Sequence, residues 1–311
     1  MPRSSRYRGR FAPTPSGPLH FGSLVAALGS YLDARAAGGQ WLVRIEDIDP
    51  PRCPQGAAST ILRQLETFGL EWDEAIMWQH TRGDAYQQAL DQLIQLGLAY
   101  PCSCSRKQWQ AFDIYPGWCR EGVCDANKPV AWRLRSDLGK RPTCWQDRLF
   151  GEQRFDPADL GDVVLKRKDG LWAYQLAVVV DDAEQQITDV VRGLDLLDNT
   201  PWQHQLQSAL QLPQPRYLHL PLIVTTEGQK LSKQNLAPAL SENEQGVRRQ
   251  LFQALEALDQ TPPQALATES PATQLHWAIA NWSLQRLRPT AHRQTPASMP
   301  PSTPPSIPTG D

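Results

Sequence analysis

The sequence predicts an α/β fold built around a parallel sheet. Near the N-terminus, apolar segments with strand spacing and helix spacing alternate along the chain. A similar pattern returns after residue 150, and the segment between the two is rich in cysteine, tryptophan and charge, with no clean period. Parallel strands need long crossover connections, which are usually helices, so this order favours a parallel sheet that is interrupted by an insertion.

The first half of the sheet is expected between residues 8 and 68. After a loop rich in Pro and Gly at residues 13–18, a helix should start near Gly22 and Ser23 and stop at Gly38-Gly39. The other elements of this half, in chain order, are a strand at 8–12, a buried strand at 41–45 and a helix at 58–68.

The second half of the sheet follows the insertion. Strand-like patterns return at residues 163–167 and 172–180. Beyond Arg288 the chain consists of Pro, Ser and Thr with little to bury, so a disordered tail is expected. The remaining elements are a helix at 200–210, an apolar segment at 217–224 that resumes the sheet, and a helix at 242–258.

Composition restricts the protein's class. Lys and Arg number 31 against 33 Asp and Glu in 311 residues, so the net charge of −2 does not indicate a nucleic-acid partner, although a local basic face would be compatible with it. The N-terminus has the charge of a signal peptide without the apolar stretch. The longest apolar run, at residues 171–180, is shorter than the ~20 residues of a membrane helix. We expect a soluble, cytoplasmic protein without a membrane partner, and its cysteines as reduced thiols.

Two segments far apart in the chain suggest an ATP-handling enzyme. The first, Pro13-Thr14-Pro15-Ser16-Gly17-Pro18-Leu19-His20-Phe21-Gly22-Ser23, leads into a helix start, where free amides and a partial positive charge attract phosphate. His20 could donate a hydrogen bond to a phosphoryl oxygen. The second, Lys230-Leu231-Ser232-Lys233, supplies positive charge. Each alone could be an ordinary loop or solvated surface lysines, and it is the pair that predicts ATP binding.

Three sequence blocks carry a resemblance to a known family. Residues 10–22 (RFAPTPSGPLHFG) resemble the "HIGH" signature region of class I aminoacyl-tRNA synthetases of the glutamyl branch. Residues 44–52 (RIEDIDPPR) resemble the next block of that branch, and residues 230–234 (KLSKQ) resemble its "KMSKS" loop. The resemblance covers about residues 7–240. It implies a Rossmann-type catalytic domain with a zinc-containing insertion and a short helical C-terminal region.

Two positions depart from the pattern of the class. Ser23 stands where a second signature histidine often stands, and Gln234 replaces the final serine of the lysine loop. We expect these two changes to alter ATP binding without abolishing it, with Ser23 capping the helix.

The chain leaves no room for a large anticodon-binding domain after the lysine loop. With Phe21-Gly22-Ser23 after His20, this resembles the glutamyl-Q tRNA(Asp) synthetases. Such a resemblance implies ATP-dependent activation of L-glutamate without tRNA, and its transfer to the queuosine base at the wobble position of tRNA(Asp). The alternatives are a short glutamyl-tRNA synthetase that charges the acceptor end, and a non-catalytic tRNA-binding paralogue.

The resemblance also implies two sets of site residues. His20 and Lys233 would be catalytic, stabilising the triphosphate of ATP with Mg²⁺. A glutamate pocket must pair one ammonium and two carboxylates, so it needs both an anion and a cation. The implied ATP-binding set is Pro13, Ser16, Gly17, His20, Gly22, Ser23, Lys230 and Lys233, and the implied glutamate-binding set is Arg10, Phe11, Ala12, Pro13, Thr14, Glu46, Tyr174 and Arg192.

Plainer interpretations stand beside some of these roles. Tyr174 precedes an apolar segment and could belong to the core. Arg192 could form a salt bridge at a strand end. We interpret Asp47, Asp49 and Arg52 as a structural ion-pair set.

The cysteines of the insertion suggest one structural zinc ion. From spacing alone, Cys102, Cys104, Cys119 and Cys124 suffice for a tetrahedral site. The resemblance instead implies Cys102, Cys104, Tyr115 and Cys119, which leaves Cys124 as the rival ligand and idle thiols without metal as the alternative. Cys53 and Cys144 should be unliganded. Such a site would brace the insertion and take no part in catalysis.

The expected organisation follows from these assignments. We expect a monomer whose catalytic domain itself binds the anticodon loop, with L-glutamate, ATP and queuosine-containing tRNA(Asp) as partners. The expected segments are 1–99 and 151–240 for the two halves of the nucleotide-binding catalytic domain, 100–150 for the insertion, 241–287 for a helical C-terminal region and 288–311 for the tail.

Overall fold

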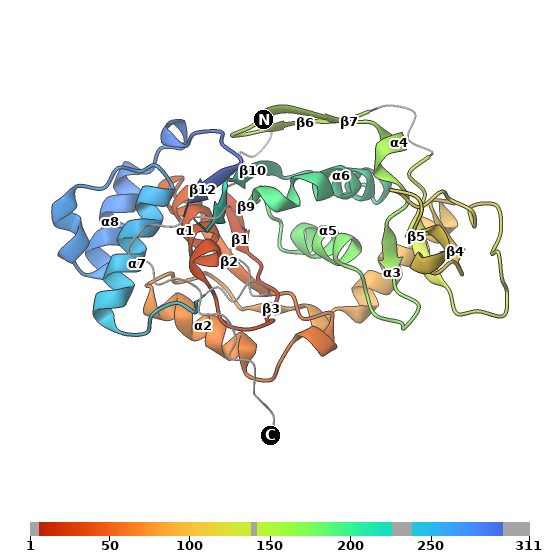
Figure 1. Ribbon diagram of the computed structural model, residues 1–311, viewed down its shortest axis with the longest axis horizontal. Coiled ribbons are helices and arrows are strands. Elements are labelled where there is room, and N and C mark those ends of the chain that lie inside the picture. Colours follow the sequence, from red (N-terminus) through yellow and green to blue (C-terminus); the bar gives the residue numbers. More distant parts are fainter. Residues whose placement is uncertain (1–5, 138–141, 226–237, 295–311) are drawn as a thin grey trace, which may run out of the picture.

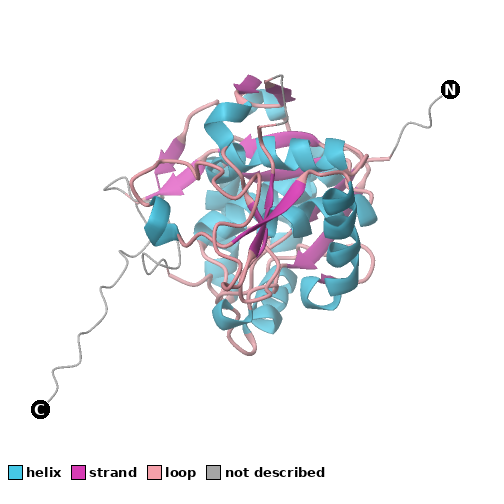
Figure 2. Cartoon of the chain, turned by 90° about the vertical axis from the view of Figure 1, so that its right-hand side faces the viewer, coloured by secondary structure: helices cyan, strands magenta, loops and turns pink. Residues whose placement is uncertain are grey.

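The computed structural model describes residues 6–137, 142–225 and 238–294. Its strands and helices form a central sheet flanked by helices, with a smaller antiparallel sheet and a helical region at opposite ends of the molecule (Figure 1). Viewed along the long axis, helices surround the central strands (Figure 2). The predicted α/β class is confirmed.

The first half of the central sheet consists of three parallel strands. β1 (Arg8–Phe11) pairs with β2 (Gln40–Ile45), which pairs with β3 (Met77–Trp78). The crossovers are α1 (Phe21–Ala36) and α2 (Ala57–Thr67), close to the predicted bounds. α1 stops before Gly38, whose φ of +63° favours glycine, and this confirms the predicted end of the helix.

The second half of the sheet continues the first. Its strand order is β7 (Gly151–Phe155), β6 (Thr143–Asp147), β10 (Arg216–Leu220) and β9 (Asp189–Gly193), with all pairs parallel except β6–β7. β9 begins beside β1, where the Thr188 amide donates to the Arg8 carbonyl over 2.9 Å. The parallel strands of both chain halves therefore end at the same edge of the sheet, and the order of the strands along the sheet reverses between β1 and β9. Ligands bind at such places in open parallel sheets.

The prediction of a strand at residues 172–180 is wrong. The chain there forms α5 (Tyr174–Glu184), which packs against α3 (Gly83–Gln95) and α6 (Thr200–Ala209). α5 is buried on most sides, so its apolar run lacks the polar face that marks a surface helix. A short continuous apolar run of this kind does not distinguish a buried strand from a buried helix.

The insertion carries a sheet of its own. β4 (Ala99–Cys102), β5 (Ala131–Leu134) and β8 (Val164–Lys166) pair antiparallel, and the short α4 (Pro157–Leu160) precedes β8. β8 comes from residues after 150, whereas β6, inside the segment assigned to the insertion, belongs to the central sheet. The predicted segment boundaries stay a prediction.

The C-terminal region contains the helix predicted at residues 242–258, and a short strand lies inside the segment where a disordered tail was expected. α7 (Glu244–Ala257) is capped by Asn243, and α8 (Pro271–Asn281) packs against it. β12 (His292–Gln294) pairs in parallel with β11 (Leu222–Val224), and Arg293 forms an ion pair with Asp259. Residues 288–294 are therefore ordered, because backbone pairing and ion pairs replace the missing apolar burial. Residues 295–311 lie outside the described part.

No helix among the described residues combines the length and the apolar composition that crossing a bilayer requires.

Candidate active site

A cavity of about 330 Å³ opens at the carboxyl ends of the central strands, and we call it the Arg192 cavity. β1, β9 and the segments that follow β1 and β2 supply most of its polar side chains, and the start of α5 closes one side. Pro13 is absent from the wall, but its carbonyl accepts a hydrogen bond from the Glu46 amide over 3.0 Å. The predicted glutamate-binding residues that line the cavity are Arg10, Phe11, Ala12, Thr14, Glu46, Tyr174 and Arg192.

Two buried arginines next to this cavity are neutralised by carboxylates. Arg10 Nε lies 3.0 Å from Asp182 Oδ1, and Arg44 lies 2.8 Å from the same oxygen and 3.3 Å from Glu46. Burial opposes ionisation of Asp182, but Arg10 and Arg44 outweigh it and lower the pKa of this carboxyl. The sequence analysis missed Arg44 and Asp182. An acidic residue directly after a buried apolar run was the available signal.

Glu46 supplies the anion of the cavity wall. Its side chain is 7% exposed, and Arg44 is its ion-pair partner. Burial raises the pKa of Glu46 above the ordinary value, and the neighbouring arginines offset only part of this effect. A cation that entered the cavity would therefore stabilise the ionised carboxylate.

Arg192 is a buried cation that neutral groups hold. Its Nε donates to His219 Nε2 over 3.1 Å, and its terminal nitrogens donate to Gln203 at 2.9 Å, to Thr200 at 2.8 Å and to the Leu196 carbonyl at 3.2 Å. Within the described ranges no carboxylate lies within ion-pair distance of Arg192, so the strand-end salt bridge is not found there. An uncompensated buried cation beside a cavity favours an anionic ligand.

Tyr174 has contacts that fit both a role in glutamate binding and a place in the apolar core. It is the first residue of α5, it lines the Arg192 cavity, and its half-buried ring packs against the apolar cluster around α3 and α5. Burial raises the pKa of Tyr174, so the phenol remains a neutral hydrogen-bond donor.

A second cavity of about 200 Å³ lies at the start of α1, and we call it the His20 cavity. His20, Gly22 and Ser23 line it, and it shares Ala26 and Gly193 with the Arg192 cavity. The two cavities therefore adjoin, as sites for two substrates that react with each other must.

The start of α1 differs from the expectation in one detail. Ser23 does not cap the helix: His20 is the N-cap, and its Nδ1 accepts a hydrogen bond from the Ser23 amide over 3.3 Å. The extended backbone of His20 points the ring over the first turn, which a residue already inside the helix cannot do. A Cβ at Gly22 would lie 3.2 Å from the His20 ring, so the ring leaves little room for a side chain there.

The other predicted ATP residues are placed in part. The Ser16 amide donates to the Thr14 carbonyl over 2.8 Å, and Gly17 has a φ of +143°, which favours glycine. Lys230 and Lys233 lie outside the described residues. On either side of that segment, Ile223 lines the His20 cavity and Ala239 forms a β-bridge with His20.

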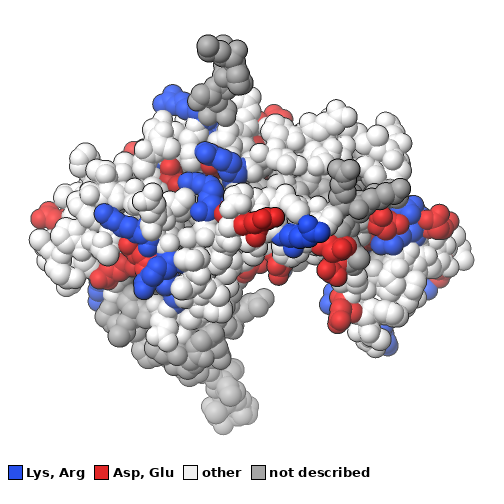
Figure 3. Space-filling view, turned by 90° about the horizontal axis from the view of Figure 1, so that it is seen from above, with Lys and Arg blue, Asp and Glu red and all other residues white. Residues whose placement is uncertain are grey.

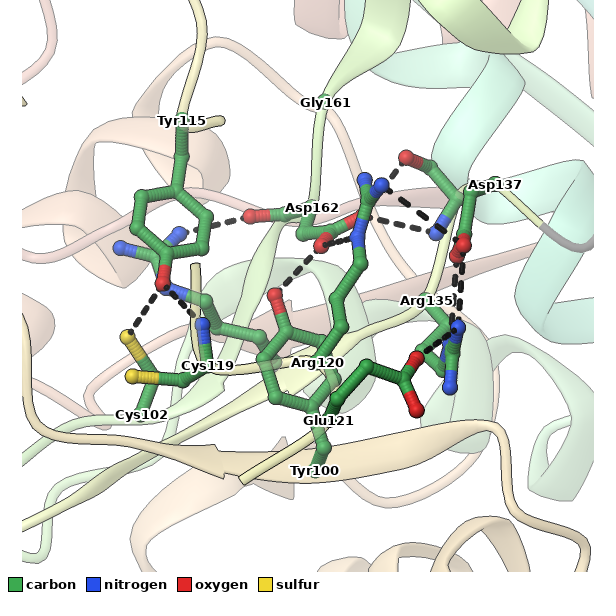
Figure 4. Close-up of polar contacts among 12 residues, drawn as sticks. Tyr100, Cys102, Tyr115, Cys119, Arg120, Glu121, Arg135, Asp137, Gly161 and Asp162 are labelled. Carbon is green, nitrogen blue, oxygen red and sulfur yellow. Dashed lines mark hydrogen bonds and ion pairs between the residues drawn. The ribbon is translucent and has the colours of Figure 1, made fainter. Parts of the chain in front are cut away.

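The cysteine cluster consists of Cys102, Cys104, Cys119 and two neighbours, Tyr115 and Cys124. The first three sulfur atoms lie within 4.8 Å of one another. The Tyr115 hydroxyl lies 3.3 Å from Cys102 Sγ (Figure 4) and 3.5 Å from Cys104 Sγ. Cys124 Sγ lies 3.3 Å from Cys119 Sγ and 3.9 Å from Cys104 Sγ.

These spacings suit tetrahedral zinc ligation. With bonds of about 2.3 Å to sulfur and about 2.0 Å to oxygen, a tetrahedron has S···S edges of about 3.8 Å and S···O edges of about 3.5 Å. Cys104 Sγ lies 3.6 Å from Cys119 Sγ. Tyr115 is buried whereas Cys124 is exposed, so the two candidates for the fourth position differ in access to solvent. Cys53 and Cys144 do not belong to the cluster.

A buried carboxylate supports the insertion behind the cysteine cluster. Asp162 accepts hydrogen bonds from Tyr100, from Arg120 at 2.6 and 2.8 Å, and from the Ser136 amide and hydroxyl at 2.9 and 2.7 Å (Figure 4). Burial opposes its ionisation, but these donors outweigh it and lower the pKa of Asp162. The sequence analysis missed this residue, because its partners are distant in the chain.

The ion-pair set predicted after β2 is confirmed for Asp49 and Arg52. Arg52 Nε lies 2.7 Å from Asp49, while Asp47 pairs with His80 at 2.5 Å. Arg52 also lines the Arg192 cavity.

Comparisons with known proteins agree with this architecture. A family model described as "tRNA synthetases class I (E and Q), catalytic domain" matches residues 6–112 and 120–264. The glutamyl-Q tRNA(Asp) synthetase of Chromobacterium violaceum is 51% identical over 300 residues, covering 94% of this chain and 98% of the relative. The protein of the same name from Pseudomonas aeruginosa is 53% identical over 287 residues, covering 91% and 96%.

Solved structures give the same result. A glutamate tRNA ligase from Elizabethkingia meningosepticum, in complex with its amino acid, superimposes with a TM-score of 0.81 at 25% identity, over 94% of this chain and 68% of that one. The glutamate-tRNA synthetase from Elizabethkingia anophelis has a TM-score of 0.80. Family match, sequence identity and fold agree, and the chain therefore belongs to the class I tRNA synthetases (E and Q), whose catalytic domain it contains.

Proposed function

We propose that the protein activates L-glutamate with ATP in the absence of tRNA and transfers the glutamyl group to the queuosine base at the wobble position of tRNA(Asp). The observation that carries this proposal is the charge pattern of the Arg192 cavity. Arg192 lacks a carboxylate partner within the described ranges, and Glu46 faces the same space. Arg10 and Arg52 also line the cavity but pair with Asp182 and Asp49, so the charges of Arg192 and Glu46 suit a substrate with an ammonium and carboxylates. Relatives that carry the glutamyl-Q name support the final acceptor.

The first step is formation of an adenylate. A glutamate α-carboxylate oxygen attacks the α-phosphorus of ATP, the bond from that phosphorus to the β-phosphate bridging oxygen breaks, and pyrophosphate leaves with the electron pair. His20 and the first amides of α1 stabilise charge on the phosphates, together with Lys230 and Lys233. Mg²⁺ bound to the nucleotide neutralises further charge when it is present.

The second step transfers the amino acid. A hydroxyl of the queuosine base attacks the carbonyl carbon of the adenylate to form an ester, the bond from that carbon to the phosphate oxygen breaks, AMP leaves with the electron pair, and the hydroxyl proton is released. Arg10, Glu46, Tyr174 and Arg192 hold the glutamyl group during both steps, because the chemistry requires positioning and no covalent enzyme intermediate.

For the insertion we propose one structural zinc ion held by Cys102, Cys104, Tyr115 and Cys119. The ligand-to-ligand spacing and the burial of Tyr115 support this set over one with the exposed Cys124. Burial raises the pKa of the Tyr115 phenol, so the bound metal would have to supply the charge that deprotonates it.

We further propose that the enzyme acts as a cytoplasmic monomer and that the catalytic domain itself binds the anticodon loop. Lys and Arg are interspersed with Asp and Glu on the face seen in Figure 3. Binding would therefore use local cations on phosphates, and tRNA affinity should fall as salt rises. An affinity that is independent of salt would contradict this arrangement.

A second candidate is charging of the tRNA acceptor end. The structural match to a glutamate tRNA ligase favours it, because that fold is shared over most of this chain. The two functions separate when tRNA(Asp), incubated with enzyme, ATP and labelled glutamate, is digested with nuclease and chromatographed. Label on the queuosine nucleoside supports the proposal, and label on the terminal adenosine supports charging.

Glutamate activation has its own test. Exchange of labelled pyrophosphate into ATP that depends on glutamate and needs no tRNA is the expected result. Its absence would favour a non-catalytic tRNA-binding protein.

A further inference from the structure

A buried hydrogen-bonded chain lies behind Arg192. His219 Nδ1 lies 2.6 Å from Asp147 Oδ2, and His219 Nε2 lies 3.1 Å from Arg192 Nε. Both the histidine and the aspartate side chains are fully buried. β6, β10 and β9 supply the three residues, so the chain runs across three adjacent strands toward the Arg192 cavity.

The partners fix the proton on the imidazole. Arg192 Nε carries a hydrogen at every physiological pH and cannot accept, so His219 Nε2 must be the acceptor. The proton of neutral His219 therefore sits on Nδ1 and is donated to Asp147. A protonated His219 would direct a second N–H at Arg192 and place two cations 3.1 Å apart.

Asp147 is itself rigidly held. Its Oδ1 accepts from the amides of Leu149 at 3.0 Å and Phe150 at 2.9 Å, and its Oδ2 accepts from the amide of His219 at 3.2 Å as well as from the ring. Such a carboxylate can neither rotate nor donate, so it dictates the tautomer of His219.

Charged groups around His219 come from several elements. Asp147 lies on β6, Arg192 on β9 and Asp195 in the turn after β9, while Thr200 of α6 offers a neutral hydroxyl 3.4 Å from Nε2. Burial and Arg192 lower the pKa of His219, with the two carboxylates opposing them. The lowered pKa and the guanidinium 3.1 Å away both favour the neutral imidazole.

We propose that Asp147 and His219 are positioning residues for substrate recognition: they fix the plane of the Arg192 guanidinium so that it meets a substrate carboxylate and rejects a carboxamide. This inference rests on the proposed activation of glutamate. A guanidinium held at Nε by a neutral acceptor keeps its full charge for the ligand, whereas one held by a carboxylate, like Arg10, does not.

The decisive variant is Asp147→Asn, which touches neither cavity. The amide would direct N–H groups at His219, shift its proton to Nε2 and turn the acceptor for Arg192 into a donor. We expect the KM for glutamate in pyrophosphate exchange to rise about tenfold or more, the loss of one hydrogen bond to a charged group, with the KM for ATP unchanged. Discrimination against L-glutamine as a competitor should fall in parallel.

A matched pair at His219 separates positioning from folding. His219→Gln can still present an oxygen near Arg192 Nε, whereas His219→Asn retains only the contact with Asp147. We expect the glutamate KM to rise more in H219N than in H219Q. His276→Gln on the exposed face of α8 is the control and should leave both KM values unchanged.

Nitrogen NMR of the imidazole gives a readout that does not need activity. We expect unprotonated Nε2 on His219 in the wild-type protein and protonated Nε2 in D147N. A folded D147N with wild-type glutamate KM, or a wild-type His219 protonated on Nε2, would overturn the inference. Wild-type protein without glutamate-dependent exchange would instead contradict the proposed function and leave the tautomer result standing.

Discussion

The Arg192 cavity and the insertion around Asp162 use buried charge in opposite ways. Asp162 is fully buried, and donors from several elements satisfy both of its oxygens. Arg192 is almost as deeply buried, but within the described ranges its partners are all neutral. A buried charge that is paired within the protein holds elements together, whereas an unpaired one beside a cavity can form an ion pair with a ligand. Charge balance thus distinguishes a structural site from a binding site here.

The strongest test of this contrast removes the uncompensated cation. Arg192→Gln should lower kcat/KM for glutamate in pyrophosphate exchange by about 10³-fold, because a buried charge pair with the substrate is lost. Its thermal stability should fall by about 1–3 kcal/mol, because Gln has a single NH₂ group and leaves some of the four buried acceptors of Arg192 without a donor. Arg63→Gln, which breaks an exposed pair with Glu242, is the control. Unchanged glutamate kinetics in R192Q would remove the basis of the comparison.

At Asp162 we expect a loss of stability without a change in glutamate binding. Asp162→Asn removes the closer carboxylate partner of Arg120 and leaves Asp137 at 3.6 Å, and breaking the largely buried pair with Asp162 should cost about 3 kcal/mol of unfolding free energy. Urea denaturation measures the loss, and the glutamate KM should stay within about twofold. A selective rise in that KM at unchanged stability would show that the two regions are not separate.

Removal of metal should resemble Asp162→Asn in a milder form. Treatment with a chelator is expected to lower Tm by about 3 °C, or about 2 kcal/mol in a chain of this size, without changing the glutamate KM. Elemental analysis of Tyr115→Phe and Cys124→Ser identifies the fourth ligand. We expect zinc content to fall in Y115F and to stay in C124S, and the opposite result would assign Cys124.

The smallest effect concerns Glu46 and pH. Its folded pKa is raised by burial, so its contribution to stability is present at low pH and is lost as pH rises through that folded pKa. Glu46→Gln should therefore become more stable than the wild type as pH rises through the range above about 4.3, the ordinary value for Glu. Thermal melts at several pH values measure this difference. A difference that shrinks with rising pH would show that the arginines outweigh burial at Glu46.

The sequence made much of the cavity predictable, and it failed where contacts are long-range. Residues 10–14 span the end of β1 and the loop after it, Glu46 follows β2, and strand ends can be predicted from local patterns. α5 was mistaken for a strand because its apolar run has no exposed face. Asp147 and His219 gave no signal, because 72 residues separate two side chains that only the pairing of β6 with β10 brings together.

By itself, the sequence determined the alternation of strands and helices, the helix start behind His20, the helical C-terminal region and the cysteines that gather in the insertion. These features depend on local periodicity, Gly and Pro positions and short spacings. The tertiary structure alone decided which charges are neutralised. Arg10, Arg44 and Arg192 are the same residue type in similar strands, and their roles differ because folding places Asp182 beside the first two, whereas the hydrogen-bond partners of Arg192 among the described residues are neutral.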